Sequence, residues 1–388
     1  MNLVLYFFYA VLTLTILRLL VKITLAVSYN LTRRRTLIDR YPKISVIVPA
    51  YNEEKTIGKC LHSLTQLDYP NYEVIVVDDG STDGTLKEIE KFKSRGVKVV
   101  HQENLGKANA LNRGIKEADG EIIVTVDADT ILSRDSLKRL CIRFVENPKV
   151  GAVAGNVKVY PASGMLNTLQ ATEYTTGINL TRKAESMLGC VMIVPGPIAA
   201  LRREAVEKAG LFSDDTFAED FDITMKVLKG GYRAEYEDEA VAYTDAPKSL
   251  EDLMKQRRRW YRGMLQVLDK HREVYMRLRY GWLGLLGVPN LWFEAFSPII
   301  NVTLILLAFF NILLLGESVI SFYGLSSYFL VELIVGALAL SLDPHPSRRE
   351  YLTLPLLLFY NVFLDGVRMM ALVEETVNIT MRWEKPKR

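Results

Sequence analysis

Hydrophobic residues are concentrated at the two ends of this 388-residue chain, whereas the middle carries the mixed charges of a soluble domain. At the amino end, residues 2–28 form an apolar stretch long enough to cross a hydrocarbon core, which needs about 20 residues. A cleaved signal peptide is the alternative, but the stretch has no short n-region and no small-residue cleavage site. We therefore predict a transmembrane helix over residues 1–30. Three arginines follow at positions 33–35, and this basic flank places the next domain in the cytoplasm.

The carboxyl end predicts a second membrane region over residues 291–375, with candidate spans at 291–316 and 318–342. A third apolar segment, 351–373, contains an aspartate and an arginine, and charges at membrane depth are costly unless they face protein or water. This segment therefore spans the bilayer, re-enters it or lies at its interface. The basic tail, 376–388, favours the cytoplasm, whereas three full spans after a cytoplasmic domain would place it outside. These features indicate a multi-pass protein of the cell membrane, in contact with the lipid bilayer.

Between the ends, residues 43–250 alternate short apolar runs with amphipathic stretches. Each run is rich in β-branched residues and stops at polar or glycine residues, and apolar positions between the runs recur at helical spacing. Unbroken apolar strands that alternate with helices predict an α/β fold with a mainly parallel sheet covered on both faces. The predicted strands, each with the residues that follow it, are 44–53, 72–85, 97–112 and 120–130.

Polar side chains follow each predicted strand at its carboxyl end, where ligands of such sheets bind. Five carboxylates at one edge would repel each other unless a positive partner joins them. The D-A-D sequence places two of them two positions apart, and such oxygen ligands suit Mg²⁺ or Mn²⁺ with substrate phosphates completing the shell. A solvated turn is the alternative for D-A-D alone. A metal, a diphosphate and one lysine would together balance the charge of the site. The converging side chains are Tyr51, Asn52, Glu53, Asp78, Asp79, Lys107, Asp127 and Asp129.

Two further stretches carry candidate chemistry. Residues 212–238 hold an acidic cluster before a predicted helix, where the acids either complement the helix dipole or include a carboxylate that takes a proton from a hydroxyl nucleophile. Gly196 lies between two prolines, in a rigid turn where backbone can approach a ligand closely. The domain has neither G-x-G-x-x-G after its first strand nor a Walker lysine motif, so a dinucleotide or P-loop site has no phosphate cradle.

The segment K-Q-R-R-R-W-Y-R-G at 255–263 places five cationic and two aromatic side chains in nine positions. It belongs to a linking region, 251–290, that ends in a short interfacial stretch before the C-terminal membrane helices. The formal net charge of +3 leaves no general basic surface for nucleic acid. The three cysteines have no metal-like spacing and suit a reducing compartment.

Together these motifs resemble the membrane-bound family 2 glycosyltransferases of the GT-A fold, which include the synthases of cellulose, hyaluronan, chitin and poly-N-acetylglucosamine. The resemblance rests on V-P-A-Y-N-E-E, V-V-D-D-G-S-T-D-G-T, G-K-A-N-A-L-N, D-A-D, A-E-D and Q-R-R-R-W, which occur in the family's order over residues 43–263. Each motif is weak alone, and the ordered set with Q-x-x-R-W is specific. The family more often has threonine before the Glu-Asp pair, where this chain has Ala218.

The resemblance implies roles for the residues at the nucleotide end. Tyr51 and Asp79, with Glu53 and Lys107 nearby, would hold the uridine of a UDP-sugar, and either Asp78 or Asp79 would contact the uracil.

Further roles follow for the reacting groups. Asp127 and Asp129 would hold Mg²⁺ or Mn²⁺ on the diphosphate and so stabilise charge as UDP leaves. Asp220 would be the general base of an inverting, direct displacement at the anomeric carbon. The neighbouring Glu219 and the backbone at Gly196 would contact the acceptor or product.

Gln256, Arg259 and Trp260 match the Q-x-x-R-W positions. The fork of Arg259 suits a diphosphate, Trp260 offers a flat platform under a sugar ring, and Gln256 lies on the same helix face as Trp260. Arg257 and Arg258 then face elsewhere, toward anionic lipid headgroups.

Within the family, the chain most resembles N-acetylglucosamine polymer synthases, which implies UDP-N-acetylglucosamine as donor, with UDP-glucose next. The implied function is extension and secretion of a β-linked polysaccharide. One alternative is transfer of a single sugar to a lipid acceptor such as polyprenyl phosphate, by enzymes that normally lack Q-x-x-R-W. Another is a catalytically silent, nucleotide-binding membrane regulator, which a broken metal pair or a missing base would favour. With three or four spans, a second copy or an accessory membrane subunit would complete a channel.

Overall fold

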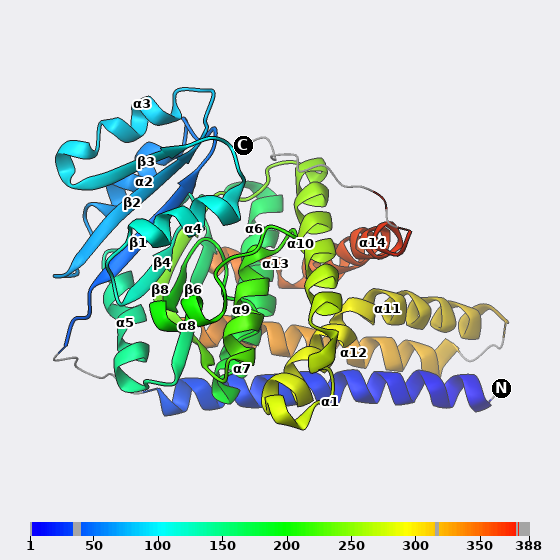
Figure 1. Cartoon of the computed structure of the whole chain (residues 1–388). Coiled ribbons are helices and arrows are strands. Elements are labelled where there is room, and N and C mark those ends of the chain that lie inside the picture. The colour runs from blue at the N-terminus through cyan, green and yellow to red at the C-terminus, as the bar shows by residue number, and fades with distance from the viewer. Residues whose placement is uncertain (1, 34–39, 315–317, 378, 380–388) are drawn as a thin grey trace.

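The structure, a computed structural model, describes residues 2–33, 40–314, 318–377 and 379. It consists of a sheet domain with helices on both faces and a group of long helices that extends from one side of that domain (Figure 1). Helix α1 (Asn2–Thr32) passes under both parts in the view of Figure 1. The chain thus consists of a sheet domain and an apolar helical region, and these two parts are in contact along α1.

The described strands form one eight-stranded sheet in the order β3-β2-β1-β4-β7-β6-β8-β5. The pairs β3–β2, β2–β1, β1–β4 and β6–β8 are parallel, whereas β7 and β5 run antiparallel to their neighbours. The expected α/β fold with a mainly parallel sheet is therefore confirmed. The strands are β1 (Ile44–Ala50), β2 (Tyr72–Asp79), β3 (Val97–Gln102), β4 (Ile122–Thr125), β5 (Thr130–Leu132), β6 (Val150–Val159), β7 (Ala199–Arg202) and β8 (Arg233–Thr244).

Helices cover both faces of the sheet. Successive residues of a strand point to opposite faces, so each strand contributes side chains to both cores. On β1, Val46 and Val48 belong to one apolar core with α2 and α5, whereas Ile47 belongs to a second core with α4 and α9. All three side chains are fully buried, which explains why the strands read as unbroken apolar runs. The helices of this domain are α2 (Ile57–Leu64), α3 (Thr85–Glu90), α4 (Lys107–Glu117), α5 (Ser136–Glu146), α6 (Gly164–Glu173), η2 (Tyr174–Asn179), α7 (Leu180–Leu188), α8 (Arg203–Lys208) and α9 (Glu219–Lys229).

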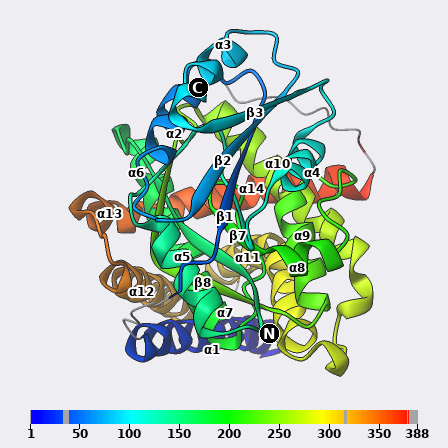
Figure 2. The same ribbon diagram turned by 60° about the vertical axis from the view of Figure 1, so that its left-hand side comes forward.

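The C-terminal helices are α10 (Leu250–Lys270), α11 (Val288–Leu314), α12 (Ser318–Leu342), α13 (Arg348–Thr353) and α14 (Leu357–Thr376). Among the described residues, three helical segments are long and apolar enough to cross a membrane: Tyr9–Thr32, Leu283–Leu307 and Arg348–Thr376. Helices α1, α11 and α12 run side by side, whereas α14 runs crosswise to them and packs on α10 (Figures 1 and 2).

Helix α14 has a polar side on α10 and an apolar side that faces outward. Glu374 and Glu375 pair with Arg258 and Arg262 of α10, while Phe359 is 72% exposed. A helix with one charged face and one exposed apolar face suits the membrane interface. Of the three placements predicted for the last apolar segment, this arrangement favours the interface.

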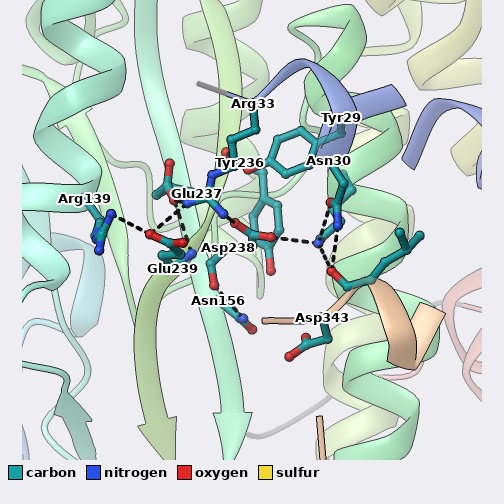
Figure 3. A network of polar contacts seen from close by, with 12 residues as sticks. Tyr29, Asn30, Arg33, Arg139, Asn156, Tyr236, Glu237, Asp238, Glu239 and Asp343 are labelled. Carbon is teal, nitrogen blue, oxygen red and sulfur yellow. Dashed lines mark hydrogen bonds and ion pairs between the residues drawn. The ribbon is translucent and has the colours of Figure 1, made fainter. Parts of the chain in front are cut away.

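The end of α1 is fastened to the sheet domain by a polar network (Figure 3). Arg33 pairs with Asp238 in the irregular part of β8, and Lys183 of α7 lies 2.7 Å from the other oxygen of the same carboxylate. Asn30 Nδ2 donates to the carbonyl of Leu342, the last residue of α12, at 2.9 Å. The apolar helices and the sheet domain are therefore connected through buried charge rather than through apolar packing alone.

Candidate active site

The centre of the candidate site is an ammonium group between carboxylates. Lys107 is the first residue of α4, and its Nζ lies 2.7 Å from Asp127 Oδ1 and 2.9 Å from Glu219 Oε1. Asp127 follows β4 and Glu219 begins α9, so three elements meet here. Burial lowers the pKa of Lys107, but the charges of Asp127, Glu219 and Asp220 outweigh it and hold the pKa above its ordinary value. Lys107 therefore acts as a fixed cation.

Asp220, in the first turn of α9, has the environment of a general base. Burial and the neighbouring Glu219 carboxylate raise the pKa of Asp220 to about 6, against the opposing effects of Lys107 and two backbone N–H groups. Its Oδ1 accepts from the N–H of Phe221 at 2.8 Å, and its Oδ2 accepts from the N–H of Gly196 at 3.2 Å. A carboxylate whose pKa lies near the working pH can take up a proton and then release it.

Gly196 brings the backbone close to these charges. A Cβ atom at this position would lie 2.8 Å from Lys107 Nζ and 3.1 Å from Asp127 Oδ1, both shorter than ordinary contacts. The turn at Gly196, which was predicted from its two flanking prolines, therefore lies directly against the Lys107–Asp127 pair. The structure brings five of the predicted residues to one small cavity: Lys107, Asp127, Gly196, Glu219 and Asp220.

Asp78 and Asp79 end β2 but do not join this cluster. Asp79 accepts hydrogen bonds at 2.9 Å from the N–H groups of the two residues that precede Lys107, and Asp78 Oδ2 lies 2.7 Å from His101 Nδ1. The turn between β3 and α4 folds over the end of β2, so these two acids have partners other than Lys107. Asp79 positions Lys107 instead. Contact of either acid with uracil stays a prediction.

A groove of about 900 Å³ is lined by Asn52, Glu53 and Asp129. Tyr51 precedes these residues on the same turn and is half-buried, outside the lining of the groove. The groove is also lined by Tyr160 and Tyr243, from the ends of β6 and β8, whose ring centres lie 5.7 Å apart. The groove thus offers acidic and aromatic groups together, as nucleotide and sugar sites do.

The two acids of D-A-D lie in neighbouring spaces, Asp127 in the cavity with Lys107 and Asp129 in the groove. Within the described ranges, no three His, Cys, Asp or Glu side chains are grouped to hold a metal by themselves. The donors still fit Mg²⁺ or Mn²⁺, because such ions bind one or two carboxylates and take their other ligands from water and phosphates. Around Asp127 three carboxylates surround one ammonium, and this negative excess favours a divalent cation.

The Q-x-x-R-W residues lie on α10. Gln256 is buried, and its Oε1 accepts from Arg257 Nη1 at 2.8 Å. Arg257 is buried too: it lies 2.6 Å from Glu173 Oε2, and its guanidinium carbon lies 4.3 Å from the centre of the Trp260 ring. The expectation that Arg257 faces lipid headgroups is wrong, because Glu173 of α6 neutralises its charge inside the protein.

Arg258 also has a protein partner, Glu374 of α14, but its side chain is 36% exposed, so its contact with lipid headgroups stays a prediction. Arg259 differs: it is partly buried, and it makes no hydrogen bond or ion pair with any residue that the structure describes. A guanidinium without a protein partner can bind a diphosphate. Trp260 is 36% exposed, with its ring centre 6.3 Å from that of Tyr174, so part of its surface is open to a sugar.

Sequence reasoning missed four residues that shape the site. Glu173 and Tyr174, at the junction of α6 and η2, hold Arg257 and Trp260, and Tyr160 and Tyr243 line the groove. None of them belongs to a recognisable motif. A polar or aromatic residue at a helix or strand end is too common to mark a site.

Part of the chain matches the sequence model of a known protein family and two named relatives. The family model described as "Glycosyl transferase family 2" matches residues 45–210, so this segment forms a family 2 glycosyl transferase domain. A poly-beta-1,6-N-acetyl-D-glucosamine synthase of Staphylococcus aureus (strain COL) is 34% identical over 248 residues, which are 63% of this chain and 60% of that synthase. The corresponding synthase of Staphylococcus epidermidis is 35% identical over 227 residues, 58% of this chain and 55% of that protein. The chain therefore matches about 60% of the length of these curated relatives.

Among solved structures, the mannosyltransferase PcManGT from Pyrobaculum calidifontis, in complex with GDP-Man and Mn²⁺, has a TM-score of 0.65 to this chain. The alignment covers 98% of both chains at 23% sequence identity. The likeness extends over the sheet domain and the long helices alike, and at this identity it establishes the fold.

Proposed function

We propose that this protein is a membrane-embedded, inverting glycosyltransferase that transfers N-acetylglucosamine from UDP-N-acetylglucosamine to a growing β-linked polysaccharide. The observation that carries the proposal is the position of Asp220, whose pKa is raised to about 6, beside the Lys107–Asp127 pair of a family 2 domain. Relatives named poly-beta-1,6-N-acetyl-D-glucosamine synthases support the choice of sugar, and UDP-glucose is the next candidate donor.

In the proposed reaction Asp220 removes the proton from the acceptor hydroxyl as that oxygen attacks the anomeric carbon. UDP leaves from the opposite side, so a single base is sufficient and no covalent sugar–enzyme intermediate forms. The N–H groups of Gly196 and Phe221 orient the carboxylate toward the acceptor. Because the pKa of Asp220 is about 6, the base is ionised at neutral pH and still has the basicity that proton removal needs.

A separate set of charged side chains binds the diphosphate of the leaving UDP. Asp127 and Asp129 would hold Mg²⁺ or Mn²⁺, which neutralises developing charge on the diphosphate when bound. Lys107, which Glu219 and Asp127 keep charged, contributes a fixed positive charge, and Arg259 has the free guanidinium to bind phosphate oxygens. Positive charge placed before the reaction lowers the barrier without reorganisation.

The same proposal assigns residues to the uridine end and to the acceptor end of the site. Tyr51 and Glu53 hold the uridine beside the groove, while Gln256 and Trp260 lie on the acceptor side. The exposed part of Trp260 stacks on the acceptor sugar, and the buried Gln256 keeps Arg257 and Trp260 in place.

For the membrane we propose three spans, α1, α11 and α12, with α14 at the cytoplasmic interface. The parallel course of the three helices, the crosswise course of α14 and its exposed apolar side support this topology (Figures 1 and 2). It places the sheet domain and the basic tail in the cytoplasm, which removes the conflict in the sequence-based topology.

The test uses the full chain in detergent or nanodiscs with labelled UDP-sugars and Mg²⁺ or Mn²⁺. We expect UDP release and long oligomers with UDP-N-acetylglucosamine, and loss of both on chelation of the metal. Asp220→Asn should stop turnover while UDP still binds, whereas Asp214→Asn, an exposed aspartate of the same loop, should retain activity. A single-sugar product on polyprenyl phosphate would contradict polymer synthesis, and absence of UDP release with every UDP-sugar would contradict glycosyl transfer.

A further inference from the structure

Asp222, two positions after the proposed base on α9, is a fully buried carboxylate that takes no part in the proposed reaction. Its Oδ1 lies 2.9 Å from both His271 Nε2 and Lys270 Nζ, at the end of α10, and its Oδ2 lies 2.7 Å from Lys226 Nζ. Burial alone would raise the pKa of Asp222, but hydrogen bonds from these three side chains outweigh it and hold the pKa well below its ordinary value. Asp222 is therefore an anion that connects the first turn of α9 to the end of α10.

His271 completes this connection from inside the protein. It is 4% exposed, and its Nδ1 lies 3.1 Å from the Nζ of Lys229, in the last turn of α9. Lysine has only donors, so Nδ1 accepts, and the ring proton is on Nε2, which donates to Asp222. His271 thus bonds to both ends of α9, and we call Asp222 and His271 the α9–α10 joint.

One face of α10 meets the start of α9 at two further points. A Cβ atom at Gly263 would lie 2.8 Å from the Cβ of Ala218, so the two segments are in close contact here. The Oε1 atom of Gln266 accepts from the N–H of Phe217 at 3.1 Å. Gly263, Gln266 and Lys270 recur at helical spacing, so these contacts and the joint lie along the same side of α10.

This side of α10 also carries Arg259, the proposed diphosphate ligand, one turn before Gly263. Gly263 lies beside Ala218, which immediately precedes α9. His271 lies beside Lys229, in the last turn of α9. The two helices therefore run in the same direction, and Arg259 lies toward the end of α9 that carries the proposed base. The contacts that fix α10 on α9 thereby fix the distance between the arginine and the base.

We propose that Asp222 and His271 are positioning residues for glycosyl transfer, which hold α10 on α9 so that Arg259 binds the leaving diphosphate while Asp220 acts on the acceptor. This inference rests on the proposed function and adds to it two residues that touch no substrate. Replacing a buried charged network by apolar side chains is often neutral or stabilising, so stability alone gives little reason for this one. Geometry does, because a displacement of about 1 Å can cost about 100-fold in rate.

The test is a double-mutant cycle on kcat/KM for UDP release by the full-length protein, with His271→Leu and Arg259→Ala alone and combined. His271→Leu removes the donor to Asp222, and we expect a fall of about fivefold in kcat/KM. In the Arg259→Ala background the same change should cost less than about twofold, because the group that the joint positions is then absent. A purely structural role predicts the same loss in both backgrounds.

Two further variants separate positioning from stability. His271→Gln has an amide N–H that can replace Nε2–H toward Asp222, so its kcat/KM should stay within about twofold of wild type. Lys183→Met is the matched control, because Lys183 lies 2.7 Å from Asp238 in an equally buried ion pair at the contact between α1 and the sheet domain. We expect this control to lower the Tm and to leave kcat/KM unchanged at temperatures below the Tm.

The positioning role is refuted if His271→Leu leaves kcat/KM of the folded protein unchanged or lowers it equally in both backgrounds, or if His271→Gln loses as much as His271→Leu. An Arg259→Ala variant with wild-type kcat/KM refutes it too, since the joint then has nothing to position. If His271→Leu does not fold, Lys270→Met replaces it in the cycle, because it removes the other partner of Asp222 on α10 at a partly exposed position. A wild type that releases no UDP from any UDP-sugar refutes the proposed function instead, so the two failures are distinguishable.

Discussion

Replacement of Asp220 by asparagine should stabilise the protein and inactivate it. The pKa of Asp220 is raised from 3.8 to about 6, mainly by burial. Because the folded state then binds this proton more tightly than the unfolded chain, Asp220 weakens the folded state as the pH rises from about 4 to about 6, and the full penalty is present at pH 7. A shift of this size corresponds to about 3 kcal/mol.

The asparagine side chain removes this penalty but has only one acceptor oxygen for the N–H groups of Gly196 and Phe221. The N–H group left without a partner costs about 1 kcal/mol. The net gain at neutral pH is therefore about 2 kcal/mol, or a rise in Tm of about 4–8 °C for a domain of this size. Loss of a general base lowers turnover by about 10²–10⁴.

The assay is thermal unfolding of the wild type and Asp220→Asn at pH 7.5 and pH 5, together with UDP release over the same range. The stabilisation should be full at pH 7.5 and clearly smaller at pH 5, because pH 5 lies within the range from about 4 to about 6 in which the penalty develops. Wild-type activity should rise with an apparent pKa of about 6. An equal difference in Tm at both pH values, or near-normal turnover of the variant, would refute the reasoning.

Three further substitutions test neighbouring contacts. Arg259→Ala should raise the KM for UDP-sugar about tenfold in steady-state assays with an unchanged Tm, because Arg259 has no partner in the described structure; a lower Tm would disprove its assignment to ligand. Arg257→Ala should lower the free energy of unfolding by about 3 kcal/mol in denaturant titrations, since the mostly buried Glu173 carboxylate would lose its cation and keep only the Tyr360 hydroxyl; a stability equal to wild type would disprove the contribution of the ion pair. Gly196→Ala should move the ammonium of Lys107 away from Asp127 and reduce kcat about tenfold with little change in Tm; wild-type kcat would show that the close approach is unimportant.

The sheet and its ligand-binding edge were predictable from the sequence because they depend on short-range patterns. Val46, Ile47 and Val48 form an unbroken apolar run, and such a run is stable as a strand only if helices bury both of its faces. In a parallel arrangement the residues after each strand come to one edge. This is why Lys107 and Asp127, twenty positions apart, could be expected together, and they lie 2.7 Å apart.

The partners within that edge were less predictable. Asp78 and Asp79 have the same residue type and strand-end position as Asp127, yet Asp79 accepts backbone N–H groups and Asp78 pairs with His101. Arg257 and Arg259 are likewise two positions apart on one helix, and only Arg257 meets a carboxylate, Glu173 of α6. Which of two like charges is neutralised depends on elements distant in the chain.

The sequence by itself determined the apolar ends, the alternation of strands and helices, and the order of the motifs, because these follow from local periodicity and the covalent spacing of residues. Only the tertiary structure decided that α14 lies crosswise and that Arg257 is covered. These features depend on which surfaces meet, and ion pairing at those surfaces joins residues far apart in the chain, such as Arg257 and Glu173, which are 84 positions apart. Local pattern carries no information about such contacts.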